Sequence, residues 1–213
     1  SNLGDDDYGK ECLAALKREH VSTEFVKINK GKKTNYHYVL WYENDRTILI
    51  KHEKYEYSLP HIGSPRFVYL SSLGENSLSF HQDIMEYFIK HPEIKLAFQP
   101  GTYQIKFGKE KLAGLYKRAD VVLCNKEESQ KILRIQERNI KRLLELVHDL
   151  GPKIIVITDG PSGAYVFDGS QMWFMPPYPD PRPPFERTGA GDAFSSTFCV
   201  ALAYGLSVTD ALR

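Results

Sequence analysis

The stretch "DVVLCNKEES", residues 120–129, determines how this sequence is expected to fold. Four apolar residues follow Asp120 without interruption, and a run rich in Lys, Glu and Ser comes directly after them. A short continuous apolar run bounded in this way is typical of a strand that is buried on both faces of a sheet. Asn125 stands three residues before Glu128, as in the first turn of a capped helix. The stretch therefore predicts a buried strand that leads straight into a helix.

The same strand and helix unit recurs along much of the chain. Further strands are predicted at residues 66–70, 94–98 and 153–158, and helices at residues 77–90, 109–116 and 126–150. Strands that are separated by helices of this length form a parallel sheet with helices on both faces. The predicted fold class is therefore α/β with a mostly parallel central sheet.

Two predicted hairpins and the beginning of the chain depart from this alternation of strands and helices. Residues 34–52 are rich in β-branched and aromatic side chains on both sides of "END", which is typical of a hairpin. A second hairpin is predicted about Asp168 and Gly169. Near the start, Asp7 is expected to cap a helix over residues 8–20, and an edge strand is expected after it.

The composition limits the classes of function. Lys and Arg number 28 against 27 Asp and Glu, so no large basic field is expected to hold a nucleic acid. Three cysteines without a C-x-x-C pair argue against a disulfide framework or a thiolate zinc site. The apolar runs are far shorter than the ~20 residues that span a bilayer. No membrane partner is expected, and with no visible signal peptide the expected compartment is the cytoplasm.

The two ends of the sequence are unusual for an α/β protein. The chain opens on a loop and a helix with no strand before them, and it stops where another helix begins. A length of 213 residues fits one domain of ordinary size. We therefore expect residues 1–213 to form a single domain that is incomplete at both ends.

The segment "ERTGAGDAF", residues 186–194, carries a pattern suited to phosphate chemistry. Gly189 and Gly191 let the backbone turn tightly and let a ligand approach without meeting a Cβ. The residues that follow have the spacing of a buried helix, whose first N–H groups attract a phosphate. Asp192 lies in that first turn, where a carboxylate can accept a proton from an alcohol that attacks phosphorus. Helix capping after a glycine turn explains this motif about equally well.

Two further loops follow predicted strands, at the edge where open α/β sheets bind ligands. Asn125 and Glu128 carry the oxygens that magnesium prefers, although the same pair also makes a capping box. Thr158, Gly160 and Gly163 lie on a turn whose backbone groups can contact a nucleotide. A plain turn between a strand and a hairpin is about as compatible with these three residues.

Three polar residues on the same expected edge are weaker candidates. Ser71, Ser72 and Lys106 all follow predicted strands, and we expect contact with a substrate there.

Four motifs together resemble a known family. "GDDDYG", "NKEE", "TDGPSGAYVF" and "ERTGAGDAF" occur in the order and approximate spacing of the PfkB, or ribokinase-like, carbohydrate kinases. The resemblance covers essentially the whole chain, and G-A-G-D with its helix is the specific part. It implies a ribokinase-like three-layer α/β/α sandwich with a small β-strand lid. It also implies ATP-dependent phosphorylation of a sugar hydroxyl.

The resemblance implies a role for each matching residue. Asp192 matches the family's catalytic base. Its anion hole is matched by Gly189, Ala190 and Gly191. The motif that places magnesium and phosphate is matched by Asn125 and Glu128, and the nucleotide loop by Thr158, Gly160 and Gly163. ATP and Mg²⁺ are therefore the implied cofactors.

The resemblance also implies a lid and shows several departures. Residues 23–57 look like the family's β lid, which covers the sugar and often pairs with a second subunit, so a homodimer is implied. Glu186 replaces the usual Asp in a region that, with Thr188, contributes to a monovalent-cation site in relatives, which leaves potassium use open. Gln99 and Pro100 stand where relatives often have Asn-Pro or Asp-Pro. The family's first strand and its sugar-gripping Gly-Gly and Asn elements would precede "GDDDYG".

Two alternatives to a sugar kinase remain open. The family also contains nucleoside kinases, and the aromatic residues Tyr36, Tyr38, Trp41 and Tyr42 are able to stack on a base as well as fill a sheet face or a dimer contact. The second alternative is a protein that keeps the fold but only binds its ligands. The intact G-A-G-D and N-x-x-E motifs argue against it.

Overall fold

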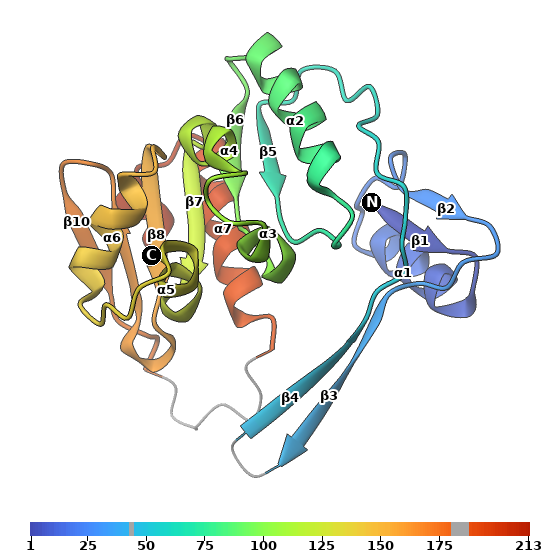
Figure 1. The fold of residues 1–213 in the computed structure, drawn as a ribbon, viewed down its shortest axis with the longest axis horizontal. Helices are drawn as coiled ribbons and strands as arrows, with labels where there is room; N and C mark the ends of the chain where they lie inside the picture. Colours follow the sequence, from blue (N-terminus) through green and yellow to red (C-terminus); the bar gives the residue numbers. More distant parts are fainter. Residues whose placement is uncertain (43–44, 180–187) are drawn as a thin grey trace. The chain divides into compact units, whose positions relative to one another are not determined.

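The computed structural model describes residues 1–42, 45–179 and 188–213 (Figure 1). The chain divides into two compact units. One comprises Ser1–His61 with Gly74–Ser77, and the other comprises Ile62–Leu73 with Leu78–Arg213. Glu186, a candidate for a cation site, and the turn at residues 43–44 lie outside the described residues.

The larger unit is built on a six-stranded sheet. Its strands are β5 (Phe67–Leu70), β6 (Lys95–Phe98), β7 (Val121–Asn125), β8 (Ile154–Thr158), β9 (Ala164–Phe167) and β10 (Met172–Met175). They lie in the order β10-β9-β8-β7-β6-β5. β5 to β8 are parallel, whereas β9 and β10 are antiparallel to their neighbours. The prediction of a mostly parallel sheet with a second hairpin is confirmed.

Helices cover both faces of this sheet. They are α2 (Leu78–Lys90), α3 (Thr102–Phe107), α4 (Ala113–Arg118), α5 (Lys126–Leu133), α6 (Ile140–His148), α7 (Ala190–Ala203) and α8 (Val208–Leu212). In Figure 1, α7 lies behind the sheet, and α4, α5 and α6 lie in front of it. Helices on both sides give the larger unit its three layers.

The first loop after β6 shows where the sequence prediction was wrong. A single helix was predicted at residues 109–116, but the chain forms α3 and then α4. The Gln104 amide causes the difference. Its Oε1 accepts hydrogen bonds from the Leu73 and Gly101 N–H groups, and its Nε2 donates to the Ser71 carbonyl. These bonds hold α3 against the loop after β5, and Gly108 ends the helix with φ +89°.

The smaller unit contains a parallel pair of short strands, one helix and a hairpin. The strands are β1 (Asn2–Gly4) and β2 (Lys27–Asn29), the helix is α1 (Asp7–Arg18), and the hairpin is β3 (Tyr36–Tyr42) with β4 (Asp45–Lys51). The hairpin predicted within residues 34–52 is confirmed. The expectation that no strand precedes the first helix is wrong, because Asn2–Gly4 pairs with Lys27–Asn29 and forms β1.

The sequence predicted Asp7 as the cap of α1, but the capping residue is Asp6. The Asp6 carboxylate accepts hydrogen bonds from the Gly9 N–H at 3.0 Å and from both the N–H and the hydroxyl of Thr34. The Thr34 hydroxyl bond is the main reason that the pKa of Asp6 is lowered. Asp6 therefore joins α1 to a residue 28 positions away, and this distant partner fixes where the helix begins.

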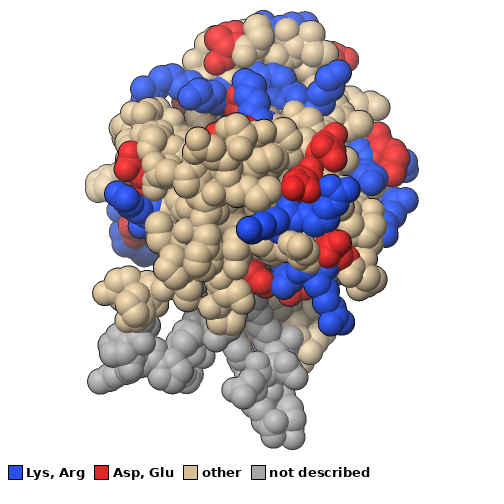
Figure 2. All heavy atoms as spheres, turned by 90° about the vertical axis from the view of Figure 1, so that its left-hand side faces the viewer, with Lys and Arg blue, Asp and Glu red and all other residues tan. Residues whose placement is uncertain are grey.

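The surface of the larger unit carries charges of both signs. Figure 2 shows the side of the molecule that includes β10 and α6, where Lys and Arg side chains lie among Asp and Glu around an uncharged area. In the part of the chain that the structure describes, no helix has both the length and the apolar character needed to cross a membrane.

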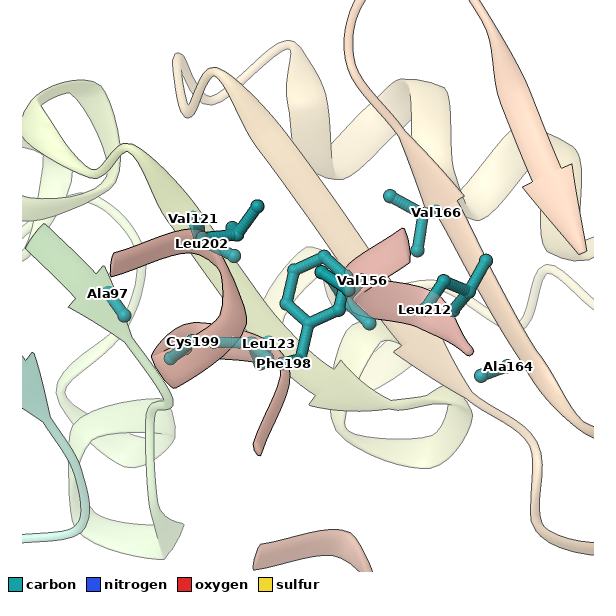
Figure 3. Packing of buried hydrophobic residues seen from close by; sticks show 11 residues of the cluster. Ala97, Val121, Leu123, Val156, Ala164, Val166, Phe198, Cys199, Leu202 and Leu212 are labelled. Atoms are coloured by element: carbon teal, nitrogen blue, oxygen red, sulfur yellow. The ribbon is translucent and has the colours of Figure 1, made fainter. Parts of the chain in front are cut away.

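The core behind the sheet explains the uninterrupted apolar strands. Val121 and Leu123 of β7 belong to the cluster that contains Phe198 of α7 (Figure 3). Val122 and Cys124, the alternate residues of the same strand, are buried as well. Because successive side chains of a strand point to opposite faces, four consecutive apolar residues, Val121 to Cys124, are expected only when both faces of β7 are covered.

We expect Phe198→Ala to lower the free energy of unfolding by about 3–5 kcal/mol, because it leaves a cavity in the middle of this cluster. Phe198 is 1% exposed, whereas Val200 of the same helix is 53% exposed. Val200→Ala is therefore the matched control and should stay within about 0.5 kcal/mol of wild type. Urea denaturation followed by circular dichroism measures both. Equal stability of the two variants would contradict this account of the core.

Candidate active site

A cavity of about 590 Å³ opens at the carboxyl ends of β5 and β6 and at the start of α7. Its lining comes from four separate stretches of the larger unit: Tyr69, Ser71, Ser72, Gln99, Pro100, Gly101, Thr102, Glu128, Asp192, Ala193 and Ser196. The predicted candidates Asp192, Glu128, Ser71 and Ser72 are all in this set. The structure therefore brings together residues that are far apart in the sequence, at the edge of the sheet where open α/β folds bind ligands.

Asp192 lies in the first turn of α7 with its side chain toward the cavity. It is exposed, and its Oδ1 accepts a hydrogen bond of 3.0 Å from the Gln99 amide. The first turn also carries backbone donors. The Ala193 N–H donates to the Gly189 carbonyl at 2.8 Å, and the N–H groups before Ala193 have no acceptor within the helix. The Asp192 carboxylate thus lies in the same helical turn as N–H groups that have no acceptor within the helix.

Glu128 and Asn125 form the predicted capping box at the start of α5. The Glu128 N–H donates to Asn125 Oδ1 at 2.8 Å, and the Asn125 N–H donates to Glu128 Oε2 at 2.9 Å. Burial raises the pKa of Glu128, and the charge of Asp192 contributes to the rise. The capping role of this pair is confirmed. It leaves the Oε1 atom of Glu128 available for a ligand in the cavity.

The loop after β8 lies beside this capping box. Asn125 and Thr158 are paired residues at the ends of β7 and β8. One residue further along each chain, Lys126 and Asp159 form an ion pair of 3.0 Å in which both side chains are largely buried. The two loops are therefore fixed against each other.

A second cavity of about 390 Å³ lies on the other side of the α7 start. Thr158, Gly160 and Gly163 line it together with Ala190 and Gly191. Gly163 has φ +93°, and a Cβ at that position would lie 2.3 Å from the Met175 carbonyl oxygen, so only glycine fits. All three residues of the predicted nucleotide loop thus face the G-A-G-D turn.

Adjacent residues of α7 line the two cavities. Gly191 lines the second cavity and Asp192 lines the first. Gly189, just before the helix, adopts the left-handed conformation with φ +82° that the predicted tight turn needs. A group that reaches from one cavity into the other would pass this turn.

Two predicted candidates are not part of these cavities. Lys106 is absent from both linings, and its ammonium lies 5.2 Å from the centre of the Tyr103 ring. Thr188 is exposed just before α7. Neither residue is among the described residues that line the two cavities.

The sequence interpretation missed several residues that line the first cavity, among them Tyr69, Gln99, Thr102 and Ser196. The sequence marks Gln99 only as a replacement for the Asn or Asp that relatives of the family often have before this proline. The signal that would have found Gln99 is its position directly after a buried strand. Ser196 lies four residues after Asp192 and so on the same face of α7, and its hydroxyl donates to the Ala193 carbonyl.

No group of three or more His, Cys, Asp or Glu residues that could hold a metal occurs within the described part of the chain. Mg²⁺ is commonly bound by one or two carboxylates together with water and substrate phosphates. A single cavity-facing carboxylate such as that of Glu128 fits this mode of binding, with the remaining ligands supplied by a nucleotide.

Comparisons with known proteins agree on the family. The model for "pfkB family carbohydrate kinase" matches residues 1–213. A cytidine kinase of Thermococcus kodakarensis is 30% identical over 127 residues, which cover 59% of this chain and 45% of that protein. An ATP-dependent 6-phosphofructokinase of Thermoanaerobacterium thermosaccharolyticum is 24% identical over an alignment that covers 100% of this chain and 69% of that protein.

The fold agrees as well. Ribokinase of Arabidopsis thaliana, solved with ribose and ATP, superposes with a TM-score of 0.81 at 21% identity, over 100% of this chain and 71% of that chain. The ribokinase-like α/β fold predicted from the loop motifs is thereby confirmed. Because the family model matches the whole of this chain, residues 1–213, the chain belongs to the pfkB family of carbohydrate kinases.

Proposed function

We propose that the protein transfers the γ-phosphoryl group of ATP to a hydroxyl group of a sugar, with Asp192 as the general base. The observation that carries this proposal is that the adjacent residues Gly191 and Asp192 of α7 line two different cavities. One cavity is suited to the nucleotide and the other to the acceptor. The transferred group would then lie at the first turn of α7, where backbone N–H groups and the helix dipole stabilise negative charge.

The chemical step follows from this arrangement. The acceptor oxygen attacks the γ-phosphorus and forms a new P–O bond, while the bond from that phosphorus to the bridging oxygen of ADP breaks. The hydroxyl proton passes to Asp192, and ADP leaves with the bonding electron pair. The N–H groups of Gly189, Ala190 and Gly191 would stabilise the charge that develops on the transferred group.

The nucleotide and its metal ion are assigned to the neighbouring loops. The turn of Thr158, Gly160 and Gly163 would contact ATP in the second cavity. Glu128, and Asn125 through water, would hold Mg²⁺ together with the phosphates. When bound, the metal ion neutralises part of the phosphate charge. Because Glu128 is largely buried, its carboxylate is a strong partner for an incoming cation.

A nucleoside kinase is the second candidate, and an aromatic cluster in the smaller unit favours it. The Tyr8 and Tyr36 rings lie 5.8 Å apart, and the Tyr36 and Tyr38 rings lie 5.2 Å apart. Tyr38 is 58% exposed, so its ring is available to a flat ligand. Aromatic rings of this kind stack on nucleobases. The similarity to a cytidine kinase points the same way.

Three further expectations from the sequence remain predictions. They are the use of the β3–β4 hairpin, within residues 23–57, as a lid, a homodimer through that lid, and a cytoplasmic location. Use of potassium near Glu186 and Thr188 stays open.

In the full-length protein we expect Asp192→Asn to lower turnover by about 10²- to 10⁴-fold, because the amide cannot accept the proton. ATP binding should stay largely intact, since the nucleotide contacts lie in the other cavity. ADP formation measures turnover and calorimetry measures ATP affinity. Asp168→Asn, on the turn between β9 and β10, is the matched control and should behave like wild type. Near-normal turnover of Asp192→Asn would refute the assignment of the base.

A panel of sugars and nucleosides with labelled ATP identifies the acceptor class. The proposal predicts that label is transferred to a sugar, and transfer to a nucleoside instead would establish the second candidate. ATP binding without transfer to any member of the panel would favour a protein that only binds its ligands.

Glu128→Gln separates the catalytic role of this residue from its capping role. A glutamine still completes a capping box, so α5 should be retained. Loss of the carboxylate should weaken Mg²⁺-dependent turnover by about 10- to 100-fold. Glu127→Gln alters an exposed neighbour in the same helical turn and serves as the control. A stable Glu128→Gln variant with full activity would contradict a role in holding the metal ion.

The same variant should change how stability depends on pH. Burial raises the pKa of Glu128, so the folded protein holds this proton more tightly than the unfolded chain does. The cost of the buried charge therefore develops as pH rises from about 4.3, the ordinary value of a Glu side chain, through the raised folded-state pKa. We expect Glu128→Gln to be at least as stable as wild type at neutral pH and to lose this advantage as pH falls. Thermal unfolding across the pH range, with Glu127→Gln as reference, measures the difference.

A further inference from the structure

A chain of hydrogen bonds behind the first cavity ends on the carboxylate of Asp192. The Tyr69 hydroxyl donates to Gln99 Oε1, and Gln99 Nε2 donates to Asp192 Oδ1 at 3.0 Å. Tyr69 belongs to β5, Gln99 follows β6, and Asp192 belongs to α7. The two bonds therefore join two strand ends to the first turn of one helix.

We propose that Gln99, oriented by Tyr69, is a positioning residue that holds the Asp192 carboxylate in the orientation needed to receive the proton of the acceptor. This inference rests on the proposed function, because it assigns Gln99 a task only if Asp192 is the base. Neither residue is required to touch the reacting atoms.

The backbone at Gln99 is well fixed. Its N–H donates to the Leu70 carbonyl at 2.9 Å, which extends the pairing of β5 with β6 by one residue. Phe98 before it and Pro100 after it are both buried. The proline also restricts Gln99 to an extended backbone conformation. The amide thus starts from a rigid strand end, which makes it a better support than a loop residue would be.

Tyr69 determines which way the Gln99 amide points. An amide presents an oxygen at one end and an NH₂ group at the other, whereas an ionised carboxylate only accepts hydrogen bonds. Because the Tyr69 hydroxyl donates to Oε1, the NH₂ end must face Asp192. Burial, with smaller contributions from Cys199 and Asp192, raises the pKa of Tyr69 to about 12. Tyr69 therefore keeps its proton, and remains a hydrogen-bond donor, at neutral pH.

The consequence for Asp192 is a fixed orientation. Its side chain is exposed, and an exposed carboxylate without a partner rotates among several conformers. The bond to Oδ1 restrains this rotation and leaves Oδ2 to accept the proton of the acceptor. Because Gln99 is uncharged, it restrains the carboxylate without neutralising it. A misplacement of about 1 Å in such a group can cost 10²-fold in rate.

Gln99→Met tests the proposal because it keeps the length of the side chain and removes the donor. In the full-length protein we expect kcat to fall about 10- to 100-fold with the KM for ATP unchanged. Tyr69→Phe should lower kcat by about 3- to 10-fold, since it removes only the group that orients the amide. In the Gln99→Met background, Tyr69→Phe should have no further effect on kcat, since two residues that act through one contact are not additive.

Matched controls exclude a general loss of structure. Gln171→Met and Tyr87→Phe make the same chemical changes outside both cavities and should leave kcat unchanged. Thermal unfolding of each variant shows whether it is folded. If Gln99→Met does not fold, Gln99→Glu replaces it, and the second carboxylate facing Asp192 should lower kcat at least as far.

The outcomes separate this inference from the proposed function. If Asp192→Asn is inactive while folded Gln99→Met and Tyr69→Phe keep kcat within twofold of wild type, the positioning role is overturned and the base assignment stands. Additive losses in the double variant would also overturn it, because Tyr69 would then act independently of Gln99. If Asp192→Asn itself turns over normally, the assignment of the base fails and this inference falls with it.

Discussion

The packing of α7 against one face of the sheet is the contact on which the rest of the candidate site depends. Phe198, Cys199 and Leu202 bury this helix among side chains of β7 and β8, and each large apolar side chain buried in this way contributes about 1.5–3 kcal/mol. Apolar packing of this kind is not directional. It nevertheless fixes the first turn of α7 beside the ends of the parallel strands. Backbone donors and Asp192 are positioned because the helix behind them is held.

The loops that face α7 show how one set of bonds can serve folding and chemistry together. Asn125 and Glu128 satisfy the first N–H groups of α5, and the ion pair of Lys126 with Asp159 joins this turn to the next loop. The same geometry leaves a carboxylate oxygen of Glu128 in the cavity. A structural role and a ligand-binding role for this motif therefore do not compete. The cap provides the rigidity that a binding group requires.

The sequence predicted the strands well for a clear physical reason. β7 and β8 are covered on both faces, so every residue before the last one of each strand is apolar, and this pattern is visible without knowing which elements cover the strand. The predicted ligand loops were located for the same reason, since each begins where such a strand ends. Whether Asp192 and the matching loops act as proposed cannot be read from this pattern, and their roles remain predictions.

What the sequence did not reveal depends on partners that are distant along the chain. The short helix α3 is held by the Gln104 amide, which bonds to the loop after β5. The start of α1 is set by Asp6 and Thr34, which are 28 positions apart. Gln99 and Asp192 are 93 positions apart. Hydrogen bonds between distant residues produce no periodic pattern in a sequence, whereas the burial of apolar residues produces one.

The placement of the three cysteines has a practical consequence. Cys124 and Cys199 are buried in the larger unit, and burial raises the pKa of both thiols, that of Cys199 to about 12. Only a thiolate reacts readily with an alkylating probe. Cys12 is exposed on α1. A maleimide dye should consequently attach to the smaller unit alone in the native protein, which would provide a spectroscopic reporter without any engineered substitution.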